Sequence, residues 1–236
     1  MLIVTVESRS LNELIFKIFY NKYIKANKPC HVFFSGKSGE GKSYMALKIA
    51  EIIASELEIK IDAKHLCNYH IIYDFEDFEK VAKHVFFSSC ELPVMALMEG
   101  SVLAHARQFM SKRNILIGRI MSLSRTIRPI IFLICSQHWN DLDVYLRRRI
   151  DFFVPVVRYV SSDGHSGKPI AKVLHVGHAL TDLVLGPVYV YHKPTKQLHR
   201  LHGLTFSLPS AELIREFEKK EKARKRELIE QSLELE

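Results

Sequence analysis

A glycine-rich octapeptide in the first quarter of the chain constrains the fold more than any other feature. Residues 36–43 match the pattern G-x-x-x-x-G-K-S at every fixed position. An apolar run at 31–34 precedes them and a helix-like segment at 44–50 follows, which is the context that a phosphate-binding loop requires. Glycines let backbone N–H groups curl around a phosphate, and the start of the helix adds a positive dipole end. The pattern predicts binding of a nucleoside triphosphate rather than a glycine-rich turn that matches by chance.

Each position of this loop has an expected part in holding ATP and Mg²⁺. Lys42 is expected to neutralise β- and γ-phosphate oxygens, and the Ser43 hydroxyl to be a Mg²⁺ ligand. The predicted nucleotide-contacting set is Gly36, Lys37, Ser38, Gly39, Glu40, Gly41, Lys42, Ser43 and Tyr44.

Length and composition indicate a single α/β domain with an elaboration, because the chain has 236 residues of which 47% are hydrophobic. Its four cysteines include no C-x-x-C pair, so neither a zinc ribbon nor a disulfide framework is indicated, and a reducing compartment is expected. The longest apolar stretch, 130–135, is far shorter than the ~20 residues that span a bilayer. We therefore expect a soluble, cytoplasmic protein with no membrane segment or targeting signal, inside a host cell if a virus encodes it.

Strand-like and helix-like segments alternate along the first two thirds of the chain. Strands are predicted at 1–6, 30–35, 69–73, 94–98 and 130–136, and helices at 12–25, 41–57, 77–86 and 112–124. This alternation is typical of a parallel sheet with crossover helices. From 152 to 208 the pattern changes to short β-branched runs broken by turns, which predicts two hairpins, 152–160 with 170–176 and 188–192 with 197–201. The predicted fold class is α/β, a P-loop NTPase with a mainly parallel central sheet flanked by helices and extended by C-terminal antiparallel hairpins.

The domain organisation follows from the same pattern. Residues 1–208 are predicted to be one ATPase domain that includes the antiparallel extension at 152–208, and residues 209–236 a charged C-terminal helix or tail. Because the charges of this tail are mixed, a solvated or partly frayed helix is favoured over a contact with DNA or another subunit.

The positive charge of the chain, +8 in total, is unevenly distributed. No Asp or Glu occurs from 100 to 137, and this stretch holds Arg107, Lys112, Arg113, Arg119, Arg125 and Arg128. Such a region can bind a polyanion by releasing its counterions, or can be a solvated basic face. Arginines near a triphosphate site can also pair with phosphate oxygens.

The carboxylate that would complete hydrolysis is displaced from its usual position. A triphosphatase needs an acidic residue at the end of a neighbouring strand to hold Mg²⁺, and here the strand 94–98 ends in Met98, followed by Glu99. A thioether is a poor ligand for a hard cation. Three explanations stay open: Glu99 serves as both metal ligand and catalytic carboxylate, Asp74 reaches in, or hydrolysis is slow. Gln137 follows the strand 130–136 at its ligand-facing end, where it could contact the γ-phosphate and water or could cap a helix.

The order of these features resembles the FtsK/HerA superfamily of DNA-pumping ATPases. The features are the phosphate loop, the Met98–Gly100 segment, the basic stretch 106–114, Ser124–Arg125, Gln137 after its strand, and Leu142–Asp143 with Arg147, together covering about residues 28–160. Compact members carried by archaeal viruses and plasmids are the most similar, and phage Zot-like proteins are more distant. The resemblance implies a hexameric ring that threads double-stranded DNA, with nucleotide between subunits. It also implies Gln137 as sensor and Arg125 or Arg147 as the arginine offered to a neighbour, with Arg148 and Arg149 as competitors.

Three functions are compatible with the sequence. The first is a ring translocase that couples ATP hydrolysis to movement of duplex DNA, as in genome packaging or plasmid transfer. The second is an ATP-binding switch or scaffold with little hydrolysis, which Met98 favours. The third is a small-molecule phosphotransferase, for which the arginines at 147–149 could imitate a kinase lid, although Gln137 fits a hydrolase better.

Overall fold

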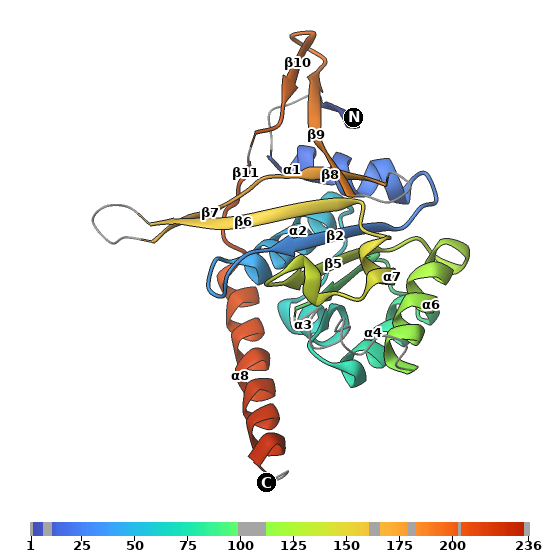
Figure 1. The fold of residues 1–236 in the computed structure, drawn as a ribbon, viewed down its shortest axis with the longest axis vertical. Helices are drawn as coiled ribbons and strands as arrows, with labels where there is room; N and C mark the ends of the chain where they lie inside the picture. The colour runs from blue at the N-terminus through green and yellow to red at the C-terminus, as the bar shows by residue number, and fades with distance from the viewer. Residues whose placement is uncertain are drawn as a thin grey trace.

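A computed structural model describes residues 2–6, 11–98, 112–160, 166–178, 183–202 and 204–233. Its centre is a mixed sheet with helices on both faces (Figure 1). Five adjacent parallel strands follow the order β3 (Ile71–Ile72), β4 (Val94–Leu97), β5 (Ile131–Ser136), β2 (Cys30–Ser35) and β6 (Phe152–Val160). Strands β2, β4 and β5 are buried and almost entirely apolar, as expected for a parallel sheet covered on both faces.

The order of the parallel strands decides which chain segments meet at the carboxyl edge of the sheet. Strand β2 lies between β5 and β6, and Ser35 at its end is in register with Ser136 on one side and Pro155 on the other. Strand β5 separates β2 from β4. Segments that follow β2, β5 and β4 therefore leave the sheet side by side.

Beyond β6 the sheet continues with antiparallel strands, as the sequence predicts. Strands β8 (Leu174–His178) and β9 (Leu183–His192) extend it, and β10 (Gln197–Arg200) forms a hairpin with β9. Strand β7 (Ser166–Ala171) pairs with the distal part of β6 and with β11 (Leu204–Thr205). Figure 1 shows the β6–β7 and β9–β10 ribbons projecting from the body of the molecule. The predicted fold class is confirmed.

Three of the predicted strands differ from the structure. Strand β1 (Leu2–Val6) pairs in parallel with β9 at the far edge of the extension, not with the main parallel strands. The predicted strand 170–176 is two strands, β7 and β8, because the chain turns at 172–173 to pair with different parts of β6. The predicted strand 69–73 is reduced to β3, because residues 69–70 complete α3 (Ala63–His70), which begins where Asp62 accepts a 2.6 Å hydrogen bond from His65 N.

The helices divide between the two faces of the sheet. One face is covered by α1 (Leu11–Ile15), which continues as the π-helix η1 (Phe16–Ile24), together with α2 (Lys42–Glu56), α3 and α8 (Ala211–Leu233). The other face is covered by α4 (Phe75–Phe87), α6 (Lys112–Ile127) and the short α7 (Val144–Arg147). Each group of helices contributes its apolar stripe to a separate buried cluster.

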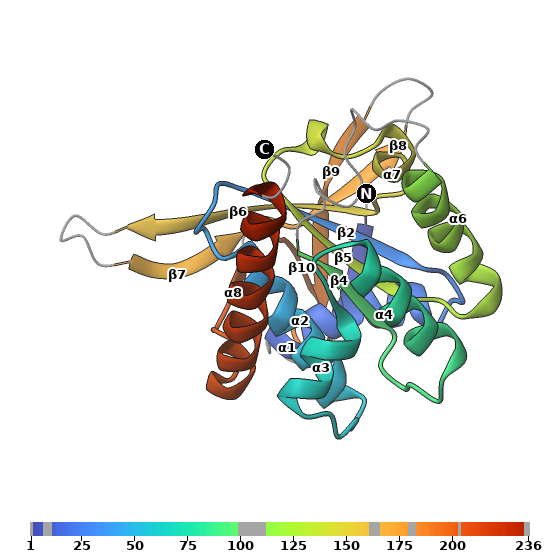
Figure 2. The same ribbon diagram turned by 90° about the horizontal axis from the view of Figure 1, so that it is seen from below.

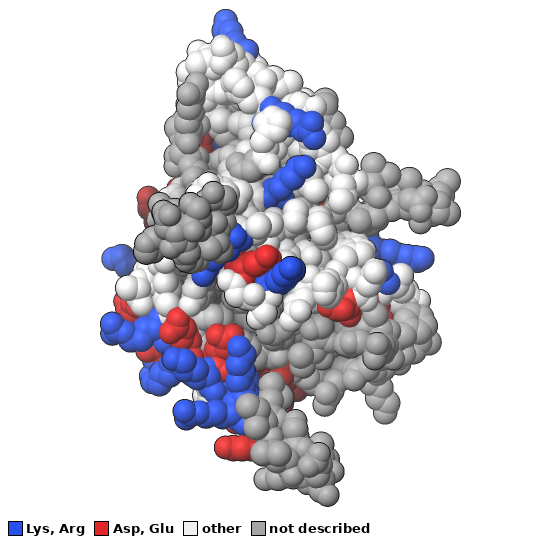
Figure 3. Space-filling view, turned by 60° about the vertical axis from the view of Figure 1, so that its left-hand side comes forward, with Lys and Arg blue, Asp and Glu red and all other residues white. Residues whose placement is uncertain are grey.

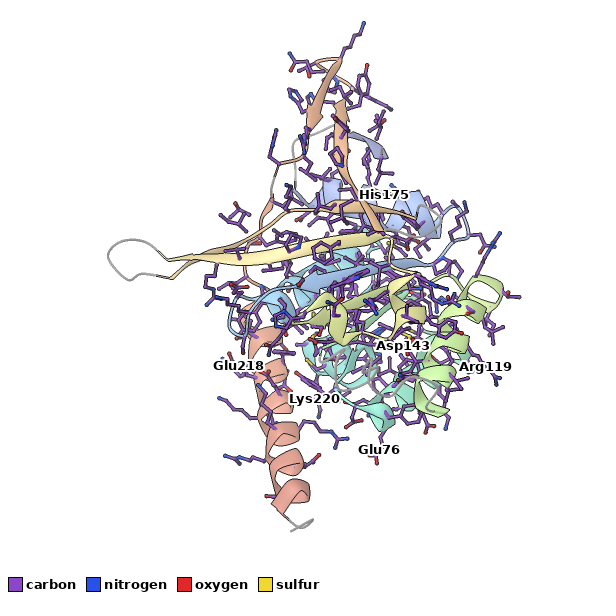
Figure 4. All side chains as sticks on the ribbon, viewed as in Figure 1. Glu76, Arg119, Asp143, His175, Glu218 and Lys220 are labelled. Carbon is purple, nitrogen blue, oxygen red and sulfur yellow. The ribbon has the colours of Figure 1, made fainter. Side chains whose placement is uncertain are left out.

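The first half of α8 is docked on the domain, which differs from the expected solvated or frayed helix. Phe217 is buried, and Lys220 Nζ donates to the carbonyl oxygens of Cys67 and Ile71 at 3.1 and 2.8 Å. Lys220 also pairs with Asp77 at 3.1 Å. Figure 2 shows α8 beside α3, and Figure 4 shows Lys220 between α8 and the body. The mixed charges of this helix, from which the sequence predicts solvation, thus include side chains with specific partners in the domain. In the part of the chain that the structure describes, no helix combines the length and apolarity needed to cross a bilayer.

Candidate nucleotide-binding site

The predicted phosphate loop connects the end of β2 to the start of α2. Gly41 is the residue before α2 and has a left-handed conformation with φ of +95°, which a residue with a side chain adopts only with strain. At Gly36 a Cβ atom would lie 2.5 Å from Val156 O and 2.5 Å from Glu40 Oε2. The loop therefore needs glycine at both fixed positions, once for conformation and once for close packing against β6.

The loop orders its own charged side chains. Lys42 Nζ donates to Gly36 O at 2.8 Å and to Lys37 O at 2.9 Å, so the ammonium group lies over the loop. Glu40 Oε2 accepts a 2.6 Å hydrogen bond from Lys37 N. The Lys42 ammonium group is thus positioned at the place where the sequence predicts phosphate oxygens.

A cavity of about 370 Å³ opens beside this loop, within the range of small-molecule sites. Its wall combines the loop and the first turn of α2 with the residues that follow β4 and β5, one residue of β6 and one face of α8. The lining residues are Ser38, Gly39, Gly41, Lys42, Ser43, Tyr44, Met98, Gln137, Arg158, Phe217, Glu221 and Lys225.

The ends of β4 and β5 contribute Met98 and Gln137 to this wall. Ser35 Oγ donates a 3.0 Å hydrogen bond to Gln137 O, which ties the residue after β5 to the end of β2. The Gln137 side chain is exposed to the cavity, where it can reach a ligand held by the loop. Met98 is only 3% exposed, so its thioether occupies the wall where a carboxylate is usual. Glu99 lies outside the described residues.

Asp74, the alternative carboxylate considered from the sequence, is used elsewhere. It is the N-cap of α4, where its Oδ1 accepts a 2.8 Å hydrogen bond from Asp77 N. It also forms an ion pair with Arg224 of α8. Asp74 is not part of the described cavity wall, so the geometry does not favour its reaching a metal ion there.

The predicted arginines lie outside the cavity wall of their own chain. Arg125 is exposed in the last turn of α6, and Arg147 Nη1 donates to Asn140 Oδ1 at 3.0 Å. Arg149 lines a second cavity of about 250 Å³, together with Arg119. Arg128 is held by the carbonyl oxygens of Val85, Cys90 and Glu91, which gives it a structural role.

Sequence reasoning missed four residues of the wall, Arg158, Phe217, Glu221 and Lys225. Arg158 Nε is buried and has no hydrogen-bond partner among the described residues, so it can donate to an anion in the cavity. The three residues of α8 follow one another at intervals of four, which places them on one helix face. That spacing was the available signal, but only the tertiary contact shows that the face points to the loop.

Two residues connect α2 directly to α8. Tyr44 follows Ser43 in the first turn of α2, and its hydroxyl donates a 2.6 Å hydrogen bond to Glu218 Oε1. Partial burial raises the pKa of Tyr44 to about 12, and the hydrogen bond to Glu218 contributes in the same direction. The hydroxyl is therefore protonated and able to donate over the physiological range.

The residues of the wall fit a magnesium triphosphate. Lys42, Arg158 and Lys225 supply cationic groups, and the turn into α2 supplies backbone N–H groups, as a polyphosphate requires. Ser43 Oγ and the Glu221 carboxylate are hard oxygen donors of the kind that Mg²⁺ prefers. Among the described lining residues, Glu221 is the carboxylate, and it is paired with Lys225 at 2.9 Å.

The sequence matches no protein-family model and no curated protein. Solved structures with a partial likeness include the HORMA:CdnC:Trip13 complex of E. coli MS115-1, with 14% identity and a TM-score of 0.40 over 63% of this chain and 56% of that one. The N-terminal domain of zonular occludens toxin from Neisseria meningitidis has 16% identity and a TM-score of 0.41, over 77% and 95% of the two chains. The flagellar accessory protein FlaH from Methanocaldococcus jannaschii has 11% identity and a TM-score of 0.38, over 75% and 89%.

The strand order, the glycine loop between β2 and α2 and the cavity beside it are all present in one chain. Together they give this protein the fold of a P-loop NTPase.

Proposed function

We propose that this chain is an ATPase that moves double-stranded DNA, and that it works as a hexameric ring. The observation that carries the proposal is the cavity in which a complete phosphate loop faces Gln137 at the end of β5. Lys42 and Arg158 would hold the phosphate groups, and Gln137 would orient the attacking water. Ser43 Oγ would help to hold Mg²⁺, which would supply positive charge against the phosphate oxygens.

The DNA part of the proposal is supported by surface charge and by the resemblance to FtsK/HerA ATPases. Arg119 and Arg125 are exposed on α6, and Figure 4 shows Arg119 at the outer edge of that helix. An exposed basic helix face can bind the phosphates of duplex DNA with little sequence preference.

Assembly into a ring is supported by the position of the predicted arginines. Arg125 and Arg147 are outside the described cavity wall of their own chain. Either residue could therefore complete the site of a neighbouring subunit, although Arg147 also donates a hydrogen bond to Asn140. An arginine supplied by another subunit would stabilise the charge that develops on the γ-phosphate.

ATP turnover measured with and without duplex DNA, beside the particle mass in solution, tests this function. We expect turnover that rises when DNA is added and a mass of six chains in the presence of nucleotide. A monomer whose turnover is the same with and without DNA would contradict the proposal. A monomer that consumes ATP only with a small acceptor would indicate a phosphotransferase.

A second candidate function, an ATP-binding switch, is favoured by one specific observation. The buried Met98 side chain takes the place of a metal-binding carboxylate, while the cavity wall includes α8, which Tyr44 and Glu218 connect to α2. Nucleotide binding could then change the position of α8 without sustained hydrolysis. Tight binding with slow, DNA-independent turnover would distinguish this candidate from the translocase.

A further inference from the structure

Three histidines meet at the edge of the sheet opposite the nucleotide cavity. His65 and His70 belong to α3, and His84 belongs to α4. One ring nitrogen from each residue lies within 4.8 Å of the other two. The cluster lies near Val94 at the beginning of β4, whereas the cavity includes Met98 beyond the end of that strand.

The most buried of the three rings is oriented as a metal ligand. His70 is 0% exposed, and its Nδ1 lies 2.8 Å from Val94 O. A carbonyl oxygen only accepts, so Nδ1 carries the proton and the lone pair is on Nε2. A ligating histidine usually has its second nitrogen bonded to a carbonyl or carboxylate in this way.

The hydrogen bonds of His84 give the same assignment. The Ser88 hydroxyl donates to the His84 carbonyl oxygen, so its oxygen is left to accept from His84 Nδ1, at 3.2 Å. The lone pair of His84 is then on Nε2. This atom is buried and has no hydrogen-bond partner among the described residues. A buried, unpartnered acceptor within such a cluster is suited to bind a cation.

Cys90 lies beside His70 and offers a fourth donor; its Sγ is outside the group of three nitrogens that lie within 4.8 Å of one another, and it donates to Leu92 O at 3.5 Å. Its Sγ lies 3.8 Å from His70 Nε2. In a tetrahedral zinc site, with bonds of about 2.1 Å to nitrogen and about 2.3 Å to sulfur, these two atoms would be about 3.6 Å apart. In the same geometry two ligating nitrogens lie about 3.4 Å apart. The distances between the three histidine nitrogens therefore need to shorten by no more than about 1.4 Å, which rotation of the partly exposed rings of His65 and His84 can supply.

An entry path to this cluster is present. A cavity of about 330 Å³ is lined by His65, His84 and Cys90 along with the loops that precede α3 and β4. The loop carrying Cys90 is held in place by Arg128, whose guanidinium donates to the carbonyl oxygens of Cys90 and Glu91. The donors therefore belong to fixed elements, and the cavity leads from solvent to His65, His84 and Cys90.

We propose that His65, His70, His84 and Cys90 form a binding site for Zn²⁺. Three imidazoles and a thiolate suit Zn²⁺ and related borderline metals, and do not suit Mg²⁺ or Ca²⁺, which prefer oxygen. With four protein ligands the site is structural, not catalytic. It fastens α3, α4 and the loop before β4 to one another, and so supports the strand that ends at the nucleotide cavity.

Metal analysis of the full-length protein, purified without chelators, tests this site. We expect one equivalent of zinc per chain, and after its removal a titration with Co²⁺ that develops the visible absorption of tetrahedral Co²⁺ and a thiolate charge-transfer band. Removal of zinc should lower the thermal midpoint. No retained zinc, no such spectrum and an unchanged midpoint would overturn the proposal.

Variants identify the ligands. His84→Ala and His65→Gln, at partly exposed positions, should each weaken Co²⁺ binding at least tenfold, and Cys90→Ser should remove the charge-transfer band. The matched control is His199→Ala with His202→Ala, an exposed pair elsewhere on the surface, which should leave binding unchanged. Circular dichroism checks that each variant is folded. Equal Co²⁺ affinity in His84→Ala and the control would exclude this cluster, whatever the result for ATP.

Discussion

The Tyr44 hydroxyl and the Glu218 carboxylate are joined by a 2.6 Å hydrogen bond between the first turn of α2 and the C-terminal helix. The Tyr44 ring also packs edge-on against Phe217, with the ring centres 6.0 Å apart. Because Tyr44 follows Ser43, the predicted Mg²⁺ ligand, we expect a movement of the phosphate loop on ligand binding to be transmitted to α8 through this pair. Figure 3 shows charged side chains of both signs in the lower part of the molecule, where Figure 1 places α8. A movement of α8 would therefore change the charge distribution on this surface.

Removing this hydrogen bond should weaken the attachment of α8. Tyr44→Phe keeps the ring and deletes the donor, so we expect the free energy of unfolding to fall by about 1 kcal/mol. Denaturation by urea measures this change. Tyr189→Phe, in β9 away from the cavity, is the control, and its free energy of unfolding should fall by less. An unchanged midpoint for Tyr44→Phe would show that the packing against Phe217, and not the hydrogen bond, holds α8.

The same tyrosine should make stability depend on pH in the alkaline range. Its folded pKa of about 12 is above the ordinary value of 10.0, so the folded state favours the protonated hydroxyl. The resulting stabilisation is complete below about pH 10 and is lost as the pH rises through 12. The difference in stability between wild type and Tyr44→Phe, followed from pH 9 to about 12, should therefore shrink. A constant difference would contradict a raised pKa.

Nucleotide binding should depend on Lys42. Lys42→Ala removes the ammonium group that the loop holds through two carbonyl oxygens, and we expect nucleotide affinity to fall at least a hundredfold, or about 3 kcal/mol. Titration calorimetry with magnesium nucleotide measures it. Lys172→Ala, an exposed lysine outside the cavity, should bind as wild type does. Full affinity in Lys42→Ala would refute the assignment of the loop.

Duplex DNA affinity should depend on the exposed basic face of α6. Arg119→Gln should weaken binding uniformly across sequences and reduce the dependence of log affinity on log salt by about 1. Fluorescence anisotropy at several salt concentrations measures both quantities. Lys172→Ala again serves as the control for a loss of net charge. If the salt dependence of Arg119→Gln equals that of wild type, this residue is not on the DNA path.

The sequence predicts those parts of the fold that are determined by residues close together in the chain. Strand β2 has the predicted bounds because a buried apolar run ends at the first glycine of the loop, and the antiparallel strands follow from turn residues between β-branched runs. The pairing of β1 with β9 joins Leu2 to Val188, and no local pattern specifies a contact between such distant segments.

The same distinction applies to the candidate sites. The phosphate loop is contiguous in sequence, so its motif can be recognised there. Arg158 and the α8 residues reach the cavity only through tertiary packing. The sequence alone likewise did not predict the histidine cluster. His65, His70 and His84 lie on two helices, and their spacing matches no short metal-binding pattern. Their meeting depends on how α3 packs against α4.

Hydrolysis should be limited by the side chain at the end of β4. Met98→Asp places a carboxylate in the cavity wall beside the loop, where it can hold a magnesium ion, and we expect the turnover rate to rise about tenfold or more if that missing ligand is the limiting defect. Because Met98 is only 3% exposed, the variant should also be less stable without nucleotide and regain stability when magnesium nucleotide is added. Met98→Leu, which keeps the size and apolar character, controls for the packing change. Steady-state phosphate release measures the rate. No increase in Met98→Asp would mean that another carboxylate already serves, and Glu221→Gln would then lower the wild-type rate if that carboxylate is the one on α8.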